Sequence, residues 1–320
     1  MLRQRIGAAQ IPPSKIDETL NIATWNIREL GKKRRADVAI HYVAEIIGQF
    51  DLVSVVELRD DLTDLGRILK ILGPYWRAVY SDMIPDAGGN RERLGFVYDK
   101  RAVAFTGLAA AANPPRRKVG TEYVPEFTWW RMPYMASFAS GNFDFVVITA
   151  HVRWGASAAE RETELASLAE WIDLKRRQRT VEDKDLIVMG DFNIPSRRSS
   201  LFRTITAKQL ELPRALAALE FGTDLAKGKR YDQIFHYPIY PENFTNAGAC
   251  STSTPATTGR SSPICRRRSS PTRSRTTCRS GCSSTPTSTA RCSTRSSAAG
   301  SAHAGIGLRA ASASQPRTMR

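Results

Sequence analysis

Six polar side chains lie at or just beyond the ends of apolar, β-rich segments. They are Asn26 in ATWNI, Glu57 in SVVEL, His151 in TAHVRWG, Asp191 and Asn193 in MGDFN, and Asp232 in RYDQIF. Taken singly, an Asp or Asn after a strand is more often a turn residue than a ligand. Taken together, such oxygen ligands at the ends of buried strands can hold a hard cation and a water against a phosphate.

The elements that must position these side chains are short strands that alternate with amphipathic helices before residue 250. The sequence predicts strands at Leu20–Ile27, Asp51–Leu58, Trp76–Met83, Leu94–Asp99, Val103–Leu108, Trp129–Phe138, Phe143–Val152, Leu186–Asn193 and Tyr231–Tyr237. Consecutive strands from Trp76 to Leu108, and again from Trp129 to Val152, look like hairpins, which a purely parallel sheet does not allow. Two packed mixed sheets with helices outside fit better.

The composition changes abruptly after Ala249. All five cysteines lie between Cys250 and Cys292, and residues 250–320 contain no Asp, Glu or Lys. The net charge of +16 would suggest a polyanionic partner, but the tail supplies 12 arginines, which leaves 35 basic and 31 acidic residues before Cys250, a net charge of +4. We therefore expect an N-terminal extension at 1–18, one domain at 19–249, and a disordered Ser/Thr/Arg-rich tail at 250–320.

The sequence also bears on the compartment. The first 249 residues lack cysteine, so the domain does not depend on disulfides, which fits a reducing compartment. The basic N-terminus has no continuous apolar h-region, and no segment approaches the roughly 20 apolar residues of a membrane span. We expect a cytoplasmic protein with no membrane association and no obligate protein partner.

The order of the motifs resembles the endonuclease/exonuclease/phosphatase superfamily, which has the deoxyribonuclease-I-like fold, over about residues 20 to 248. The resemblance rests on Trp-Asn after a first strand, Glu closing a second, Thr-x-His, Gly-Asp-Phe-Asn and Asp-x-Ile-Phe. It implies an α/β fold, a four-layer α/β/β/α sandwich of two mixed, mainly antiparallel sheets. It also implies hydrolysis of phosphate esters with Mg²⁺, for which Mn²⁺ could substitute.

The resemblance also implies a role for each motif residue. Glu57 would be the principal metal ligand, with Asn26 beside it and Asp232 completing the acidic floor. Asp191 would orient or deprotonate the attacking water, since a phosphodiester resists attack until its charge is neutralised.

The remaining implied roles concern the phosphate. His151 would contact the phosphate and stabilise its developing charge, and Asn193 would hold the phosphate and the reacting groups. Glu92 stands where nuclease members place a carboxylate that orients the catalytic histidine. Arg131 stands where they place a phosphate-binding arginine, although a structural ion pair would equally satisfy a buried arginine. For Tyr98 we expect plain packing.

One expected motif is missing from the chain. Members of the superfamily end their catalytic set with an Asp-His pair that opens a last strand, whereas here the only histidine after His236 is His303, with no acid near it. Loss of one nucleotide near the codon of Ala249 would explain this, because Arg275 to Cys282 can be read in the other frame as Asp-His-Leu-Pro-Leu-Trp-Leu. A Ser/Arg-rich RNA-binding extension and a zinc site built from Cys265, Cys278, Cys282 and Cys292 explain the tail less well, because dense Arg-Ser repeats and paired short spacings are absent.

These observations predict a divalent-metal-dependent phosphodiesterase of nuclease type, with DNA as the expected substrate, crippled here by loss of the Asp-His pair and of the final strand. The alternative within catalysis is a phosphomonoesterase or phospholipid phosphodiesterase of the same superfamily, because loops choose the substrate. The alternative outside catalysis is an inactive frameshift product. Ala87–Arg93 and the Pro-rich loop Ala109–Glu126, with Arg116, Arg117 and Lys118, are candidate substrate loops, although a basic loop is usually only solvated.

Overall fold

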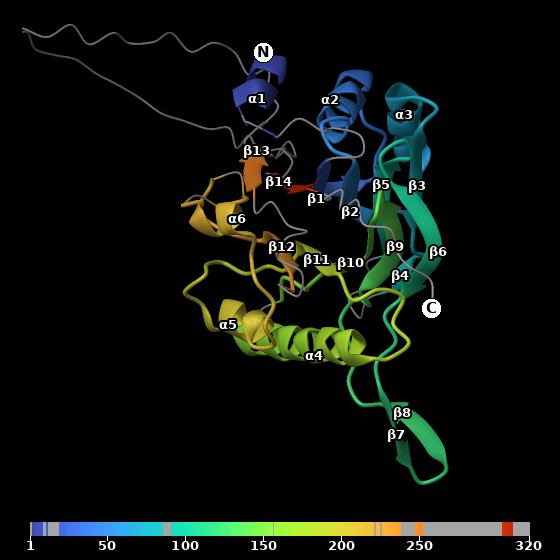
Figure 1. Cartoon of the computed structure of the whole chain (residues 1–320), viewed down its shortest axis with the longest axis vertical. Coiled ribbons are helices and arrows are strands. Elements are labelled where there is room, and N and C mark those ends of the chain that lie inside the picture. The colour runs from blue at the N-terminus through green and yellow to red at the C-terminus, as the bar shows by residue number, and fades with distance from the viewer. Residues whose placement is uncertain are drawn as a thin grey trace, which may run out of the picture. The chain divides into compact units, whose positions relative to one another are not determined.

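A computed structural model describes residues 2–8, 11, 19–85, 91–155, 157–220, 222–224, 226–237, 247–251 and 303–309. Within these residues the strands form two main sheets, shown in Figure 1. The first sheet has the order β13-β14-β1-β2-β5-β3, with β4 paired to β5. Its strands are β1 (Thr19–Leu30), β2 (Leu52–Leu58), β3 (Trp76–Tyr80), β4 (Ile84–Pro85), β5 (Arg91–Asp99), β13 (Ala247–Ser251) and β14 (His303–Arg309).

The second sheet has the order β12-β11-β10-β9-β6. Its strands are β6 (Ala104–Ala111), β9 (Tyr134–Ser140), β10 (Phe143–His151), β11 (Leu186–Asp191) and β12 (Asp232–His236). Each sheet contains one parallel pair, β1 with β2 and β10 with β11, and the other pairings are antiparallel. The mixed, mainly antiparallel sheets expected from the sequence are confirmed.

Helices lie outside the two sheets. They are α1 (Leu2–Ala8), α2 (Asp37–Ile47), α3 (Thr63–Leu72), α4 (Ala158–Arg177), α5 (Ser200–Thr206) and α6 (Arg214–Ala218). Alternate side chains of a strand point to opposite faces, so each sheet contributes to two buried layers. One layer lies between the sheets and contains Phe96 and Phe138, and a second packs β1 and β2 against α2 and α3.

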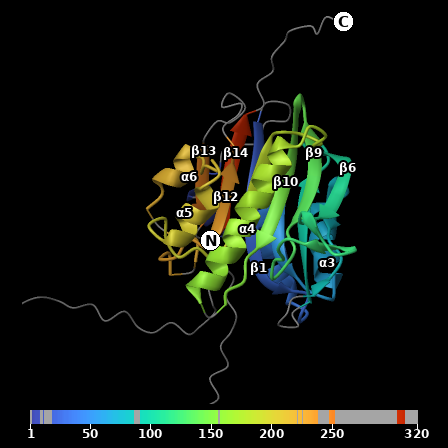
Figure 2. The same cartoon turned by 90° about the horizontal axis from the view of Figure 1, so that it is seen from below.

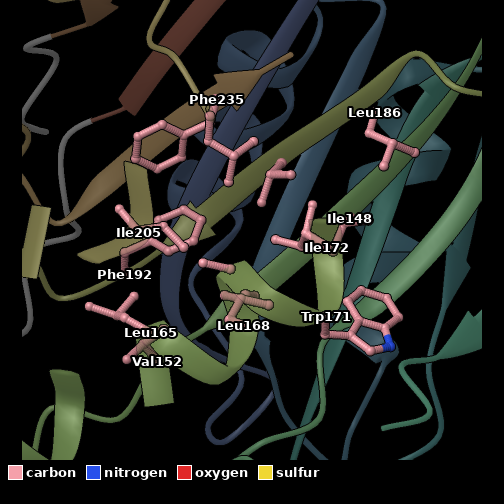
Figure 3. Packing of buried hydrophobic residues seen from close by; sticks show 14 of the residues in the cluster. Ile148, Val152, Leu165, Leu168, Trp171, Ile172, Leu186, Phe192, Ile205 and Phe235 are labelled. Carbon is pink, nitrogen blue, oxygen red and sulfur yellow. The ribbon is translucent and has the colours of Figure 1, made fainter. Parts of the chain in front are cut away.

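The third layer packs the second sheet against α4 and α5, as Figures 2 and 3 show. Ile148 on β10 and Phe235 on β12 lie in the same buried cluster as Leu168 and Ile172 on α4. Leu165, Leu168 and Ile172, which follow one another at helical spacing, thus form the side of α4 that faces the core. A buried hydrogen bond of 2.7 Å between the hydroxyls of Ser54 and Thr149 joins β2 to β10 across the inner layer. The four-layer α/β/β/α arrangement is confirmed.

The structure corrects two of the predicted strands. The expected strand Val103–Leu108 forms β6, but it leaves the first sheet and pairs with β9 in the second, so Trp76 to Leu108 is not one run of hairpins. The expected strand Trp129–Phe138 begins only at Tyr134, because Pro133 has no N–H for the ladder. Arg131 therefore lies in the loop before β9 and not on a strand.

Two further segments differ from expectation. The Pro-rich loop Ala109–Glu126 contains a separate hairpin of β7 (Arg116–Val119) and β8 (Glu122–Pro125). No strand was expected after residue 249, yet β14 pairs antiparallel with β1 and β13 pairs with β14, so the first sheet is extended at this edge. The expectation that the fold lacks its last strand is therefore wrong for the edge of this sheet.

Some expectations cannot be followed in the structure. The expected disorder of the tail falls on residues 252–302 and 310–320, and part of the candidate loop Ala87–Arg93 falls on residues 86–90, all outside the described residues. Of the expected N-terminal extension, Leu2–Ala8 forms α1. Among the described helices, none combines the length and the apolar character needed to cross a lipid bilayer.

Candidate active site

The predicted site residues gather at one end of the two sheets. A cleft of about 610 Å³ lies there, lined by Asn26, Arg28, Glu29, Glu57, Arg59, Glu92, Arg131, His151, Trp154, Asp191, Asn193 and Tyr231. β1, β2, β10 and β11 reach this end with their carboxyl termini, whereas β5 and β12 begin there. Seven of the eight predicted site residues line the cleft, and Asp232 lies beside it.

Asn26 connects the two sheets across the cleft. Its Nδ2 donates to Oε1 of Glu57 at 2.7 Å and to Oδ2 of Asp191 at 3.0 Å, while its Oδ1 accepts from the backbone N–H of Arg28. The other oxygen of the Glu57 carboxylate accepts from the backbone N–H of Glu29 at 2.9 Å. Carboxylates from both sheets therefore converge on a single amide group.

This corner has an unusual backbone. Arg28, Glu29, Glu57 and Asn193 all have positive φ, between 50° and 61°. Non-glycine residues rarely adopt this conformation, and it persists where surrounding interactions enforce it. Here the hydrogen bonds that Asn26 and the backbone N–H of Glu29 donate to Glu57 hold this backbone conformation, which turns the Glu57 carboxylate toward the cleft.

The donor set suits a hard cation such as Mg²⁺. Glu57 and Asp191 each place one oxygen within 3.0 Å of the same nitrogen atom, so two carboxylates lie close together at this point of the cleft, where Glu57 would hold the ion. The described residues hold no cluster of three or more His, Cys, Asp or Glu side chains that could bind a metal. Mg²⁺ commonly uses only one or two carboxylates, with waters and substrate phosphate as the other ligands, so the residues present fit this ion.

His151 faces the cleft from the end of β10. Its Nδ1 lies 2.8 Å from Oε2 of Glu92, and its Nε2 lies 3.9 Å from Oε1 of Glu57. Burial alone would lower the pKa of His151, but the hydrogen bond to Glu92 and the charge of Asp191 outweigh it, so the pKa is raised. The Glu92 carboxylate thus orients the ring and favours its protonated form.

Glu92 is also paired with arginine. Nε of Arg131 lies 3.2 Å from Oε2 of Glu92, and Nη1 of Arg131 donates to the carbonyl of His151 at 3.4 Å. Burial would raise the pKa of Glu92, but His151, Arg131 and Arg59 outweigh it and hold the pKa below its usual value. For Arg131 the structural ion pair is present, and the guanidinium also lines the cleft, so the two sequence alternatives are compatible.

Gly190 explains why Asp191 can stand beside His151. β10 and β11 are parallel, with Ala150 opposite Gly190 and His151 opposite Asp191. Gly190 has a φ of 140°, and a Cβ there would lie 2.0 Å from the carbonyl oxygen of Ala150. Only glycine allows this close approach, which gives the Gly-Asp-Phe-Asn motif a physical basis.

Asn193 completes this side of the cleft. Its backbone N–H donates to Oδ1 of Asp191 at 3.0 Å, and its Nδ2 donates to the carbonyl of Val152 at 2.7 Å. Arg161 on α4 donates to the carbonyl of Asn193 at 3.1 Å. The loop after β11 is therefore fixed to β10 and α4, which holds the Asn193 side chain close to Asp191.

Asp232 lies next to Asp191 in the β11–β12 ladder and is only 2% exposed. Burial raises its pKa well above the usual range, and the charge of Asp191 adds to this, while hydrogen bonds with Thr223 and the backbone of Asn26 oppose it. It does not line the cleft. Its role as a metal ligand stays a prediction.

Two further residues at or near the cleft were not singled out from the sequence. Arg59 lies 3.9 Å from the Glu92 carboxylate and adds a second cation. Glu164, buried on α4, accepts from the backbone N–H groups of Trp130 and Arg153 and so fixes the loop that carries Arg131 and the loop that follows His151. A buried acid on the apolar face of a helix is a usable signal, since such an acid needs partners.

Two aromatic side chains also belong to the cleft. Trp154 is 61% exposed, its ring lies edge-on to Tyr231 at 5.2 Å, and Arg161 lies 5.6 Å from it. An exposed tryptophan on the wall of a cleft offers a flat apolar ring face to a ligand. Trp154 follows His151 by three residues, but nothing in the local sequence shows that it faces the cleft.

Two curated deoxyribonucleases resemble the chain in sequence. The chain is 30% identical over 197 residues to a deoxyribonuclease of Thioalkalivibrio sp., covering 57% of this chain and 48% of that protein. It is 25% identical over 184 residues to deoxyribonuclease-1 of Equus caballus, covering 55% of this chain and 61% of that protein. The chain thus spans about half to three fifths of the length of these relatives.

A solved structure and a family model complete the comparison. An endonuclease/exonuclease/phosphatase family protein from Bacteroides thetaiotaomicron shares the fold with a TM-score of 0.56 and 15% identity, over 91% of this chain and 97% of that one. The model of the Endonuclease/Exonuclease/phosphatase family matches residues 23–268, beginning near the expected start at residue 20 and running past residue 248. With its motifs assembled in one cleft, the chain belongs to the Endonuclease/Exonuclease/phosphatase family.

Proposed function

We propose that this cleft is the active site of a divalent-metal-dependent phosphodiester hydrolase of nuclease type, with DNA as its substrate. The observation that carries the proposal is the Asn26 bridge between Glu57 and Asp191, adjacent to the buried Glu92–His151 pair. The relatives named as deoxyribonucleases favour DNA over a small phosphate ester.

The chain's own residues provide the expected catalytic functions. Asp191 accepts a proton from the attacking water, and Asn193 positions the phosphate beside it. Nε2 of His151 faces the cleft and donates a hydrogen bond to a phosphate oxygen as negative charge develops there. Arg59 and Arg131 add positive charge on the same side. Mg²⁺ held by Glu57, with Asn26 beside it, would supply further charge neutralisation.

Titration of the purified chain with Mg²⁺ by calorimetry tests the metal site apart from activity. We expect binding by the wild-type chain and at least about a tenfold loss in Glu57→Gln, since removing a ligand or its supporting partner costs 10- to 100-fold in affinity. Glu182→Gln is the matched control, because Glu182 is exposed near the start of β11, at the opposite end of the sheet. Equal Mg²⁺ affinity in all three proteins contradicts the proposed metal site.

We also propose that the chain as written has lost most of its activity through a frameshift near Ala249. Among the described residues that line the cleft, His151 is the single histidine, whereas the superfamily pattern has a second one in its Asp-His pair. Loss of such a group typically costs 10²- to 10⁴-fold in rate. Reading the nucleotides beyond the codon of Ala249 tests this, because an early stop codon in the other frame would exclude it.

Activity assays separate the remaining alternatives. The written chain and a frame-restored chain are compared with plasmid DNA and with a soluble phosphomonoester. Nicking by the frame-restored chain alone supports both proposals. Robust nicking by the written chain excludes the loss of activity, and phosphate release without nicking favours the phosphomonoesterase alternative.

A further inference from the structure

The β7–β8 hairpin stands apart from both main sheets. In Figure 1 it extends beyond α4, away from the sheets. All its strand residues except the intermediate Val124 are exposed to solvent. An isolated two-stranded hairpin is only marginally stable in water, so its structure depends on how its base is attached.

The base of the hairpin is attached firmly. The backbone N–H of Glu126 donates to the carbonyl of Pro115 at 2.9 Å, which closes the two strands. The indole N–H of Trp171 on α4 donates to the carbonyl of Asn113 at 3.0 Å, and Trp129 packs edge-on against Trp171 at 5.7 Å. The hairpin is therefore an arm with a defined origin.

This arm originates at the active-site end of the second sheet. Its chain leaves β6 after Ala111 and returns to β9 at Tyr134, and these two residues are paired. Tyr134 is also paired with Thr149, two residues before His151 on β10. Arg131, which lines the cleft, lies on the returning segment. The arm and the cleft thus share one end of the sheet.

One face of the arm is basic and aromatic. Arg116 is paired with Pro125 and Lys118 with Tyr123, and because strand side chains alternate, these four residues lie on the same face. Tyr123 is 63% exposed. Arg117 lies on the opposite face with Val124. Within the described residues, Arg116 and Lys118 take part in no ion pair, so their charge is available to a ligand.

We infer that this face of the β7–β8 arm binds the backbone of double-stranded DNA beside the cleft. The inference rests on the proposed function and names how a polymeric substrate is held. Cationic side chains strengthen binding to DNA because they release counterions from its phosphates. A two-stranded ribbon is narrow enough to enter the major groove. An exposed tyrosine supplies contact with sugar or base.

Fluorescence anisotropy with a labelled 20-base-pair duplex, in EDTA and over a range of salt concentrations, tests the inference without catalysis. We expect Arg116→Ser/Lys118→Ser to lower the slope of log affinity against log salt by about 2, and affinity at 0.1 M salt about 10-fold or more. Tyr123→Ala should weaken binding about fivefold without changing this slope. Circular dichroism checks that each variant remains folded.

Arg179→Ser/Lys184→Ser is the matched control. Both residues are exposed, and they lie between the end of α4 and the start of β11, at the end of the sheet opposite the cleft. The control removes one Arg and one Lys, so an equal change in slope would overturn the inference in favour of general charge attraction. If the arm variants lose as much affinity for a single-stranded oligonucleotide as for the duplex, the assignment of the arm to duplex DNA is overturned.

Hydrolysis of bis(4-nitrophenyl) phosphate separates this inference from the proposed function. In the frame-restored chain, Arg116→Ser/Lys118→Ser should hydrolyse this small diester at the unchanged rate. If the chain hydrolyses the diester but the arm variants bind duplex normally, the arm inference alone fails. If the arm variants lose duplex binding but the chain hydrolyses no diester, the proposed function alone fails.

Discussion

The carboxylate of Glu92 and the imidazole of His151 meet at 2.8 Å although the residues are 59 positions apart and belong to different sheets. Glu92 is 3% exposed and His151 is 7% exposed, so water weakens this contact little. With Nδ1 engaged by Glu92, Nε2 is the ring nitrogen that faces the cleft. The pair therefore determines which atom of His151 is presented to a substrate.

Glu92→Gln should lower kcat of the frame-restored chain about 10²-fold or more, because the neutral amide no longer favours the protonated imidazole. We expect KM for the small diester to change much less, since Glu92 contacts His151 and not the substrate. Steady-state kinetics measure both constants, with Glu182→Gln as the exposed control. An unchanged kcat would contradict the positioning role of Glu92.

Gly190→Ala should destabilise the protein by more than about 4 kcal/mol, since its Cβ would lie 2.0 Å from a backbone oxygen of β10. Gly66→Ala is the contrasting variant, because Gly66 lies in α3 with no atom within 4 Å of its added Cβ. That change should stabilise the fold by about 0.5–1 kcal/mol. Urea denaturation measures both, and equal stabilities would contradict the close approach of β10 and β11.

Trp154→Ala should weaken binding of an oligonucleotide about fivefold or more, because a stacked aromatic contributes about 1–3 kcal/mol per base. Trp154→Phe should retain most of the affinity, since it keeps an aromatic face. Unlike Arg116→Ser/Lys118→Ser, neither should change the salt slope, because no cation is lost. Anisotropy measures both quantities, and a loss in Trp154→Phe equal to that in Trp154→Ala would argue against stacking.

His236 should make stability depend on pH. Burial lowers its pKa, while the backbone at Tyr237 and the charge of Glu211 act in the opposite direction. Because the folded pKa is below the unfolded value of 6.5, the unfolded state binds the proton first. The stabilising contribution is therefore complete above pH 6.5 and is lost as the pH falls through the folded pKa.

Urea denaturation at several pH values between 8 and 5 tests this behaviour. His236→Gln should show a smaller decline in the free energy of unfolding toward low pH than the wild-type chain. His41→Gln is the control, because His41 is exposed on α2. An identical decline of the free energy of unfolding in His236→Gln and the wild-type chain would contradict the assignment of this pH dependence to His236.

Local patterns were sufficient for much of the fold. The apolar, β-rich segments became β1, β2, β10, β11 and β12, because continuous apolar runs with Gly, Pro or Asp at their ends have few other stable conformations. Their pairing was harder to foresee. β6 joins the second sheet because its partner β9 lies there, and the separation of β6 from β9 by the β7–β8 arm hides that pairing in the sequence.

The candidate site likewise has features that the sequence determines and features that only the tertiary structure decides. The residue types and motif order by themselves determined the family, and they selected Asn26, Glu57, His151 and Asp191 at the ends of strands as candidate site residues. Only the tertiary structure decided that Asn26 bridges Glu57 and Asp191, that Asp232 is buried beside the cleft, and that the basic arm begins at the active-site end. The physical reason is that hydrophobic periodicity specifies local elements, whereas hydrogen bonds between the two sheets exist only once both sheets have packed.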